Sequence, residues 1–251
     1  MSVSNGRDPD PAVSVVVPVR NEAGNIAPLV AEIEAALTGS SFEIVYVNDG
    51  STDATEAELL ALAAERPHLR QIRHGTSCGQ SAAIRTGVQN ARGPLVATLD
   101  GDGQNDPAFI PILINVIEGG GPRIGLVAGQ RVGRKATGFK RMQSRIANRV
   151  RAAVLKDGTR DTGCGLKAFR RDLFLALPYF DGLHRFLPAL VRREGFEIDY
   201  VDVVDRPRQH GVSNYGFWDR LWIGILDLAG VWWLIRRRKR VPQAEEVNRA
   251  R

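Results

Sequence analysis

Short apolar runs and amphipathic stretches alternate four times within about the first hundred residues of this chain. The first run, AVSVVVPV at 12–19, is rich in β-branched residues, as expected of a strand buried on both faces. The stretch at 26–37 then carries apolar residues at helical spacing. Because parallel strands need a crossover between them, usually a helix, this alternation predicts an α/β fold: a Rossmann-like, mostly parallel sheet with helices on both faces.

The same reading predicts the remaining elements. Further strands are expected at 42–47, 71–74, 95–99, 124–128 and 201–204. Further helices are expected at 54–66, 80–91, 109–117 and 139–155. An apolar C-terminal helix holds all four tryptophans, Trp218, Trp222, Trp232 and Trp233. The expected organisation is a polar leader at 1–12, one catalytic domain at 13–216, and a Trp-rich helix with a basic tail at 217–251.

Basic residues are concentrated in the middle of the chain. The formal net charge is +6, yet the segment from Arg131 to Arg171 holds 13 Lys and Arg against only Asp157 and Asp161. This local excess indicates an anionic partner, which could be phosphate groups, a lipid surface or nucleic acid. A solvated helix face rich in arginine is the alternative.

Cysteine usage and apolar stretches bear on the compartment. Cys78 and Cys164 are too few for a disulfide scaffold or a zinc cluster, which favours a reducing cytoplasm. Residues 1–11 lack the basic and apolar regions of a signal peptide. The apolar stretch 221–235 is shorter than the roughly twenty residues that cross a bilayer core. Tryptophans next to the basic run at 236–240 favour an amphipathic helix at headgroup level, with core packing as the alternative.

Polar side chains follow three predicted strands directly, where ligands bind in open parallel sheets. Asp100 and Asp102 follow the strand at 95–99, and paired carboxylates suit Mg²⁺ or Mn²⁺, with Gln104 as a further oxygen ligand. Asp-x-Asp also occurs in surface turns, but the preceding strand and the neighbouring Asp49 favour a metal site. The chain has neither a Gly-x-Gly-x-x-Gly after its first strand nor a Walker-type Gly-Lys-Ser/Thr, which disfavours a dinucleotide-binding fold and a P-loop NTPase.

Five segments carry a more specific resemblance. VVVPVRNE at 15–22, VNDGSTD at 47–53 and LDGDGQNDP at 99–107 resemble the landmarks of family 2 glycosyltransferases with a GT-A fold. RDTGCGLKAFRR at 160–171 and RPRQHGVSNYG at 206–216 resemble the subgroup of polyprenyl-phosphate sugar synthases, typified by dolichyl-phosphate mannosyltransferase. The resemblance runs through most of the chain.

This resemblance implies an inverting, metal-dependent glycosyltransferase that acts as a peripheral protein at the cytoplasmic face of the membrane. It would move a sugar from a GDP- or UDP-linked donor to a polyprenyl phosphate of the dolichyl or undecaprenyl type. Its cofactor would be Mg²⁺ or Mn²⁺, and an anionic membrane surface and a small membrane subunit are candidate partners.

The resemblance also implies roles for individual residues. Nucleotide binding is implied for Pro18, Arg20, Glu22, Val47, Asp49, Asp100, Gly101 and Asp102. The implied metal ligands are Asp100, Asp102 and Gln104. Binding of the acceptor phosphate is implied for Arg131, Arg160, Cys164 and Ser213. The residues expected to carry catalysis are Asp100, Asp102, Arg131 and Arg208, the two arginines by contacting phosphates.

The chemistry of such a transfer fits these residue types. A divalent ion and arginines neutralise the charge that develops on a leaving diphosphate. A lipid phosphate is already anionic, so it needs no strong base, which fits a chain with four histidines and no obvious catalytic arrangement of them. A saccharide acceptor and a non-catalytic nucleotide-sugar or membrane-surface binding module are the alternatives. Nucleic-acid binding ranks last, because few aromatic residues interleave with the basic segment.

Overall fold

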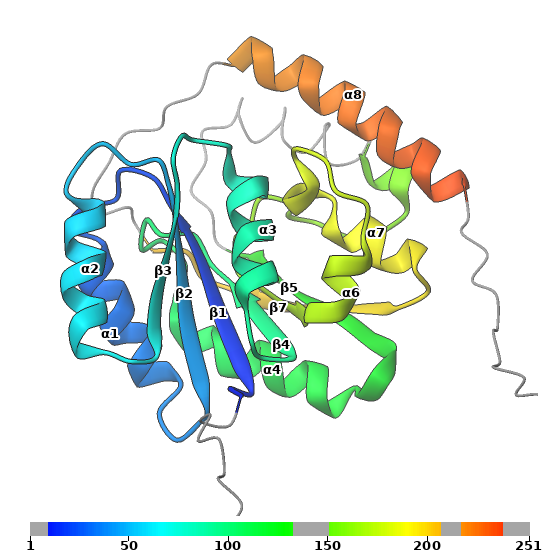
Figure 1. Cartoon of the computed structure of the whole chain (residues 1–251). Helices are drawn as coiled ribbons and strands as arrows, with labels where there is room; N and C mark the ends of the chain where they lie inside the picture. Colours follow the sequence, from blue (N-terminus) through cyan, green and yellow to red (C-terminus); the bar gives the residue numbers. More distant parts are fainter. Residues whose placement is uncertain (1–9, 133–150, 207–216, 238–251) are drawn as a thin grey trace, which may run out of the picture.

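A seven-stranded sheet forms the centre of the molecule (Figure 1). The computed structural model describes residues 10–132, 151–206 and 217–237, the last of these with side chains from residue 224 onward. The strand order is β3-β2-β1-β4-β6-β5-β7. The strands are β1 (Val13–Val19), β2 (Phe42–Asp49), β3 (Leu69–His74), β4 (Leu95–Thr98), β5 (Ile124–Arg131), β6 (Lys167–Arg170) and β7 (Glu197–Val203).

The sheet is parallel except at one strand. β1 pairs in parallel with β2 and β4, β2 with β3, and β5 with β7, whereas β6 is antiparallel to both of its neighbours, β4 and β5. The six parallel strands therefore end at one edge of the sheet. The predicted α/β fold with a mostly parallel sheet is confirmed.

Helices cover both faces of this sheet, as predicted (Figure 1). One face packs against α1 (Ile26–Ala36), α2 (Thr55–Glu65) and α4 (Ile110–Gly119), and the other against α3 (Gln80–Asn90), α6 (Arg171–Ala176) and α7 (Leu187–Arg193). Short 3-10 turns form η1 (Pro107–Phe109), η2 (Gly121–Arg123) and η3 (Leu183–Arg185). Along β1, Val15 and Val17 enter the first core and Val16 the second. A strand buried on both faces thus explains the β-branched run.

The second half of the sheet differs from the sequence prediction. β6 and the helices α6 and α7 were not expected, and β7 begins at Glu197 rather than at residue 201. β6 is only four residues long and has Lys167 and Arg170 at its ends, so it carries no apolar run. β7 is an edge strand whose exposed residues alternate with partly buried ones, which weakens its apolar signal. Most of the helix expected at 139–155 lies outside the described residues.

The C-terminal helix α8 (Phe217–Arg236) packs across α7 (Figure 1). Val231 is buried in the second core, while Leu226 and Trp233 remain 70% and 53% exposed. A helix therefore occupies the predicted segment, and its predicted role as an amphipathic membrane-interface helix stays a prediction. Among the helices that the structure describes, none is long and apolar enough to cross a membrane.

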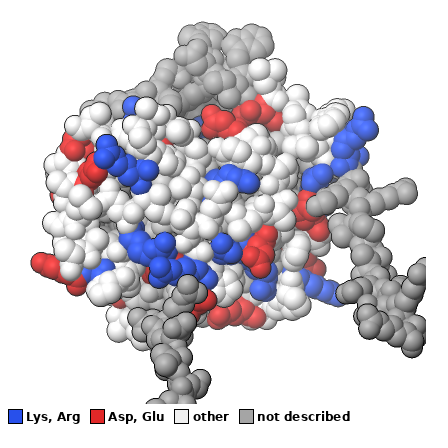
Figure 2. Space-filling view, viewed as in Figure 1, with Lys and Arg blue, Asp and Glu red and all other residues white. Residues whose placement is uncertain are grey.

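The described part of the basic segment is bonded largely within the protein. Arg151 pairs with the buried Asp157. Arg170 donates to the carbonyl oxygens of Ile124 and Gly121. On the face drawn in Figure 2, basic and acidic side chains lie interspersed among uncharged ones. Arg151 and Arg170 thus stabilise the fold, and six of the thirteen basic residues of the segment fall at 133–150, outside the described residues.

Candidate active site at the carboxyl edge of the sheet

A pocket of about 270 Å³ lies where β1, β2 and β4 end. Its lining comprises Pro18, Val19, Arg20, Glu22, Asp49, Ser77, Gly79, Gln80, Asp100, Gly101 and Asp102. Seven of the eight residues expected to bind a nucleotide therefore meet in one pocket. The exception is Val47, whose side chain is buried in the second core. Ser77, Gly79 and Gln80 come from the loop before α3 and the start of that helix, and no sequence pattern had marked them.

Asp49 anchors the loop that forms one wall of this pocket. Its Oδ1 accepts hydrogen bonds from the Cys78 backbone N–H (2.8 Å) and His74 Nδ1 (2.7 Å). Its Oδ2 accepts from Ser77 Oγ (2.7 Å) and the Gly79 backbone N–H (2.9 Å). Burial raises the pKa of Asp49, but these hydrogen bonds outweigh burial and hold the pKa below its ordinary value. Asp49 is therefore an ionised carboxylate that organises the loop.

Asp49, His74 and Cys78 also bring three potential metal-ligand atoms within 4.8 Å of one another. Each Asp49 oxygen already accepts two hydrogen bonds from the loop. A metal here would have to displace donors that fix the loop, so the group is better explained as loop structure.

Asp100 and Asp102 occupy the turn after β4. The Asp100 backbone N–H donates to Asn105 Oδ1 (3.0 Å), and Asp102 Oδ1 accepts from the Gln104 backbone N–H (3.1 Å). Burial, followed by the neighbouring charge of Asp102, raises the pKa of Asp100 to about 6. A divalent cation bound by both carboxylates would offset the cost of desolvating Asp100 and its repulsion with Asp102.

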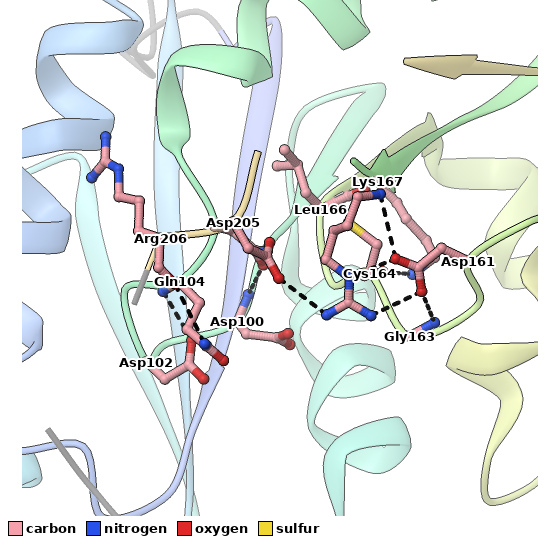
Figure 3. A network of polar contacts seen from close by, with 12 residues as sticks. Asp100, Asp102, Gln104, Asp161, Gly163, Cys164, Leu166, Lys167, Asp205 and Arg206 are labelled. Carbon is pink, nitrogen blue, oxygen red and sulfur yellow. Dashed lines mark hydrogen bonds and ion pairs between the residues drawn. The ribbon is translucent and has the colours of Figure 1, made fainter. Parts of the chain in front are cut away.

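Gln104 completes an oxygen-rich donor set at this turn (Figure 3). Its Nε2 donates to the Arg206 carbonyl oxygen (3.5 Å), and no described residue donates to its Oε1. Two carboxylates and a neutral amide oxygen match the hard-oxygen preference of Mg²⁺ and Mn²⁺. The residues present therefore fit such an ion.

Arg131 is held between two carboxylates, those of Asp161 and Asp205, which are labelled in Figure 3. It binds Asp161 through Nε (2.5 Å) and Nη2 (2.8 Å), and Asp205 through Nη1 (3.2 Å). Burial lowers the pKa of Arg131, but Asp161 and Asp205 outweigh burial and raise the pKa above its usual value. Asp205 also accepts from Asn105 Nδ2 (3.3 Å), which links Arg131 to the turn. A phosphate at Arg131 would share the guanidinium with these carboxylates.

The residues expected to bind the acceptor phosphate do not all meet. Arg160 is 73% exposed in its side chain and bonds to Gln130 and Asp202. Cys164 is fully buried, and burial raises the pKa of its thiol, which stays protonated at neutral pH. Ser213, the last of the acceptor-phosphate candidates, and Arg208, expected to take part in catalysis, lie outside the described residues.

A second cavity of about 150 Å³ begins on the other side of Asp100. It shares Gln80 and Asp100 with the first pocket, and its remaining lining is Ile84, Thr98, Thr162, Gly163, Cys164, Gly165, Lys167, His184, Arg185 and Leu187. Lys167 lies within the motif at 160–171, so the sequence motif could have identified it as a site residue. His184 and Arg185 had no such signal, because η3 reaches the cavity only through the tertiary fold.

Comparison with known protein families and sequences gives consistent results. The family model described as Glycosyl transferase family 2 matches residues 14–177. Dodecaprenyl-phosphate galacturonate synthase of Rhizobium johnstonii is 35% identical over 91% of this chain and 68% of its own length. Undecaprenyl-phosphate 4-deoxy-4-formamido-L-arabinose transferase of Edwardsiella ictaluri is 35% identical over 81% of this chain and 63% of its own length. The chain thus spans about two thirds of the length of these relatives.

Solved structures share the fold. Glucosyl-3-phosphoglycerate synthase from Mycobacterium tuberculosis, in complex with Mn²⁺, UDP and glucosyl-3-phosphoglycerate, aligns with a TM-score of 0.67 at 22% identity, covering 91% of this chain and 80% of that chain. A complex of the same synthase with Mg²⁺ and UDP aligns with a TM-score of 0.65 at 21% identity, covering 91% of this chain and 79% of that one.

Proposed function

Because this chain belongs to glycosyl transferase family 2, we propose that it is a metal-dependent, inverting enzyme that transfers a sugar from a nucleotide to polyprenyl phosphate. The two relatives described above are both named for polyprenyl-phosphate acceptors. The observation that carries the proposal is the pocket at the carboxyl edge of the sheet. It joins Asp49 and Glu22 to the acidic turn of Asp100 and Asp102.

The donor nucleotide would occupy the first pocket. Asp49 and Glu22 would bind the base and ribose, and Pro18 and Arg20 would line the same space. Solved relatives of similar fold contain UDP, so UDP-linked sugars are the first donors to test and GDP-linked sugars the second.

Asp100, Asp102 and Gln104 would hold Mg²⁺ or Mn²⁺, which when bound supplies positive charge to the leaving diphosphate. The protein contributes a turn whose geometry is already fixed. Asn105 holds the Asp100 backbone, and Asp205 ties Asn105 to Arg131. This arrangement would keep the carboxylates in place as the donor binds.

The acceptor would be a lipid phosphate whose oxygen attacks the anomeric carbon. The bond from that carbon to the diphosphate breaks, and the nucleoside diphosphate leaves with the electron pair. No base is needed because the attacking oxygen is already anionic. Arg131, Arg160, Arg208, Ser213 and Cys164 stay candidates for the acceptor side, with Arg131 beside the turn and Cys164 beside the second cavity.

We also propose that the protein binds the membrane surface through α8. Leu226 and Trp233, and likewise Ile225 and Trp232, are exposed and spaced seven residues apart, which aligns each pair along the helix. In this proposal 13–216 is the catalytic domain and 217–251 the membrane-facing segment. The cytoplasmic face and a small membrane subunit stay predictions.

A transfer assay tests the proposal. Purified protein with Mn²⁺ would be incubated with UDP- or GDP-linked sugars and undecaprenyl phosphate in detergent, and the lipid product identified by mass spectrometry. Asp102→Asn should lower kcat roughly 100-fold or more, because it removes half of the acidic pair. Leu60→Gln, on the exposed side of α2, is a matched control that should retain full activity.

Two outcomes would contradict the proposal. Transfer to an oligosaccharide but not to the lipid phosphate would show that the acceptor is a saccharide. A folded protein that binds nucleotide sugars without transferring them, and whose binding is unchanged in Asp102→Asn, would indicate a non-catalytic binding module.

A further inference from the structure

The second cavity continues the first pocket past the turn of Asp100 and Asp102, called the metal turn below. The two spaces share Gln80 and Asp100, and Gln80 Nε2 donates to Asp100 Oδ1 (2.7 Å) at their junction. On the proposed function, a donor whose diphosphate lies at Asp100 would place its nucleoside in the first pocket. The sugar of the donor would then extend into the second cavity. The side chains of the second cavity therefore bear on which sugar is transferred.

The ionisable groups of this cavity are mainly nitrogen donors. Asp100, at its entrance, is the one carboxylate among the described lining residues. Lys167 lies at the Asp100 end, where its buried Nζ donates to the Cys164 carbonyl oxygen. His184 and Arg185 come from η3 and add an imidazole and a guanidinium. A neutral or anionic ligand group suits this lining better than a cationic one.

His184 is fixed as an uncharged donor. Its Nδ1 lies 2.7 Å from Ser81 Oγ, and Ser81 Oγ also accepts the Gly182 backbone N–H (3.0 Å). With the Ser81 hydroxyl assigned as the donor to Nδ1, the neutral imidazole carries its proton on Nε2. Burial, followed by the charges of Lys167 and Arg185, lowers the pKa of His184 to about 3. The ring thus presents an N–H group without a charge.

Arg185 is held in place by its backbone. The Arg185 N–H donates to the Gly182 carbonyl oxygen (3.0 Å), and the Arg185 carbonyl oxygen accepts from Arg151 Nη2 (3.4 Å). Gly182 adopts φ +87, where a side chain would also meet Asp227 Oδ2 at 2.8 Å, so only glycine fits the start of this turn.

The guanidinium of Arg185 is free to bind a ligand. It donates to none of the residues described here. Burial raises the pKa of Asp227, and the nearby charge of Arg185 opposes that rise without an ion pair between the two described side chains. Lys167 pairs with Thr98 in the strand that leads to Asp100, whereas Arg185 comes from η3. Arg185 therefore lines the end of the cavity that η3 forms.

We propose that the transferred sugar carries a carboxylate, as in a hexuronic acid, and that Arg185 binds this carboxylate while His184 Nε2–H donates to an oxygen of the ring substituents. In a pyranose uronate the carboxylate on C5 lies across the ring from the anomeric C1. With C1 at the metal turn, the carboxylate points to the Arg185 end. Guanidinium and carboxylate match as a planar, two-bond pair.

Calorimetric titration with matched donors tests this specificity. The pairs are UDP-glucuronate with UDP-glucose and UDP-galacturonate with UDP-galactose, each with Mn²⁺, because within a pair only the carboxylate differs. The wild-type protein should bind at least one acidic donor roughly tenfold or more tightly than its neutral partner. Arg185→Gln should reduce that ratio to near one and leave the affinity for UDP unchanged. Arg123→Gln, an exposed arginine at the amino end of β5, should leave both quantities unchanged.

His184 has its own pair of variants. His184→Phe should weaken acidic and neutral UDP-sugars alike relative to UDP, because it removes a donor to the sugar. His184→Gln places an amide N–H near the position of Nε2 and should restore much of the affinity. Ser81→Ala should weaken UDP-sugar binding as well, through loss of the contact that orients the ring.

Three results would overturn the inference. Equal binding of acidic and neutral donors by the wild type would reject the proposed specificity for an acidic sugar, but not the proposed function. An Arg185→Gln protein that keeps its donor preference but has a raised KM for the lipid phosphate would assign Arg185 to the acceptor. Failure of every nucleotide sugar to bind would reject the proposed function and the inference together.

Discussion

Two carboxylates at the carboxyl ends of β2 and β4, the strands on either side of β1, differ in electrostatic state. Asp49 accepts four hydrogen bonds, which hold its pKa below the ordinary value despite burial. Asp100 is partly buried beside the buried Asp102, and loss of solvent followed by the charge of Asp102 raises its pKa to about 6. The same residue type therefore serves as a loop anchor in one place and as a candidate cation ligand in the other. The difference lies in the number of donors that the surrounding backbone and side chains supply.

Gly165 offers a direct test of the metal turn. A Cβ at this position would lie 2.4 Å from Asp100 Oδ2, so Gly165→Ala must displace that carboxylate. We expect Mn²⁺ affinity, measured by calorimetry, to fall roughly tenfold or more, and stability to fall by about 1–3 kcal/mol from overpacking. Gly75→Ala is the control, since a Cβ there meets no atom within 4 Å. Unchanged Mn²⁺ binding in Gly165→Ala would count against Asp100 as a ligand.

His184 should make stability depend on pH. Its pKa is about 3 in the folded protein against an ordinary 6.5, so between these values the unfolded chain binds more protons. The free energy of unfolding should therefore fall as pH drops from 6.5 towards 3, by at most about 1.4 kcal/mol per pH unit from this residue. Urea denaturation of wild type and His184→Gln between pH 7 and 4.5 measures the difference. Parallel pH profiles for the two proteins would refute a buried neutral imidazole.

Short elements carry the parts of the site that no periodic pattern predicted. η3 is three residues long, yet it positions His184 and Arg185, because contacts to Ser81 on α3 and Arg151 hold it in place. β6 is four residues long and runs antiparallel, placing Lys167 beside the cavity. Such elements are defined by their neighbours, so their own sequence carries little signal.

Besides the apolar contacts of Val231, one arginine of α7 bonds to the end of α8. Arg193 donates to the carbonyl oxygens of Leu234 (2.9 Å) and Arg237 (3.2 Å) at the C-terminal end of α8. Arg193→Met keeps the aliphatic stem and removes these bonds, and we expect a loss of about 1–3 kcal/mol. Limited proteolysis should then cleave α8 faster than in wild type. Arg192→Met, exposed on the same helix, is the control, and equal cleavage rates in all three proteins would contradict the anchoring role.

At the scale of the molecule, the parallel strands bring two cavities to one edge of the sheet. The first lies over β1, β2 and β4, and the second lies towards β6 and η3, with Asp100 between them. α8 crosses the helices of the second face (Figure 1) and keeps an apolar row exposed. This arrangement would place the nucleoside in the first cavity and the transferred sugar in the second, with the diphosphate between them at Asp100.

The exposed row of α8 predicts membrane binding. Leu226→Gln with Trp233→Gln should lower partitioning onto vesicles that contain anionic phospholipid by about tenfold or more, since each buried apolar side chain contributes about 1.5–3 kcal/mol. Binding of UDP-sugars should be unchanged. The control Leu60→Gln on α2 should bind vesicles like wild type, as measured by co-sedimentation. Equal sedimentation of all the proteins would argue against α8 as the membrane face.

The sequence by itself determined the first half of the sheet and which residues line the pocket at its carboxyl edge. Buried parallel strands must be apolar, helices on their faces must be amphipathic, and ligand-binding residues must follow the strand ends. Glu22, Asp49, Asp100 and Asp102 were predictable for these reasons, whereas Pro18 was predicted from the family resemblance. Val47 was predicted with them, but its side chain is buried in the core.

Only the tertiary structure decided the rest of the described site. Contacts between residues far apart in the chain joined Arg131 to Asp161 and Asp205, and brought Ser81, His184 and Arg185 to the cavity beyond Asp100. None of these side chains lies at a position that helical or strand periodicity would mark as part of a site. Long-range packing of β6, η3 and α3 put them there, because each short element takes its position from the larger elements around it.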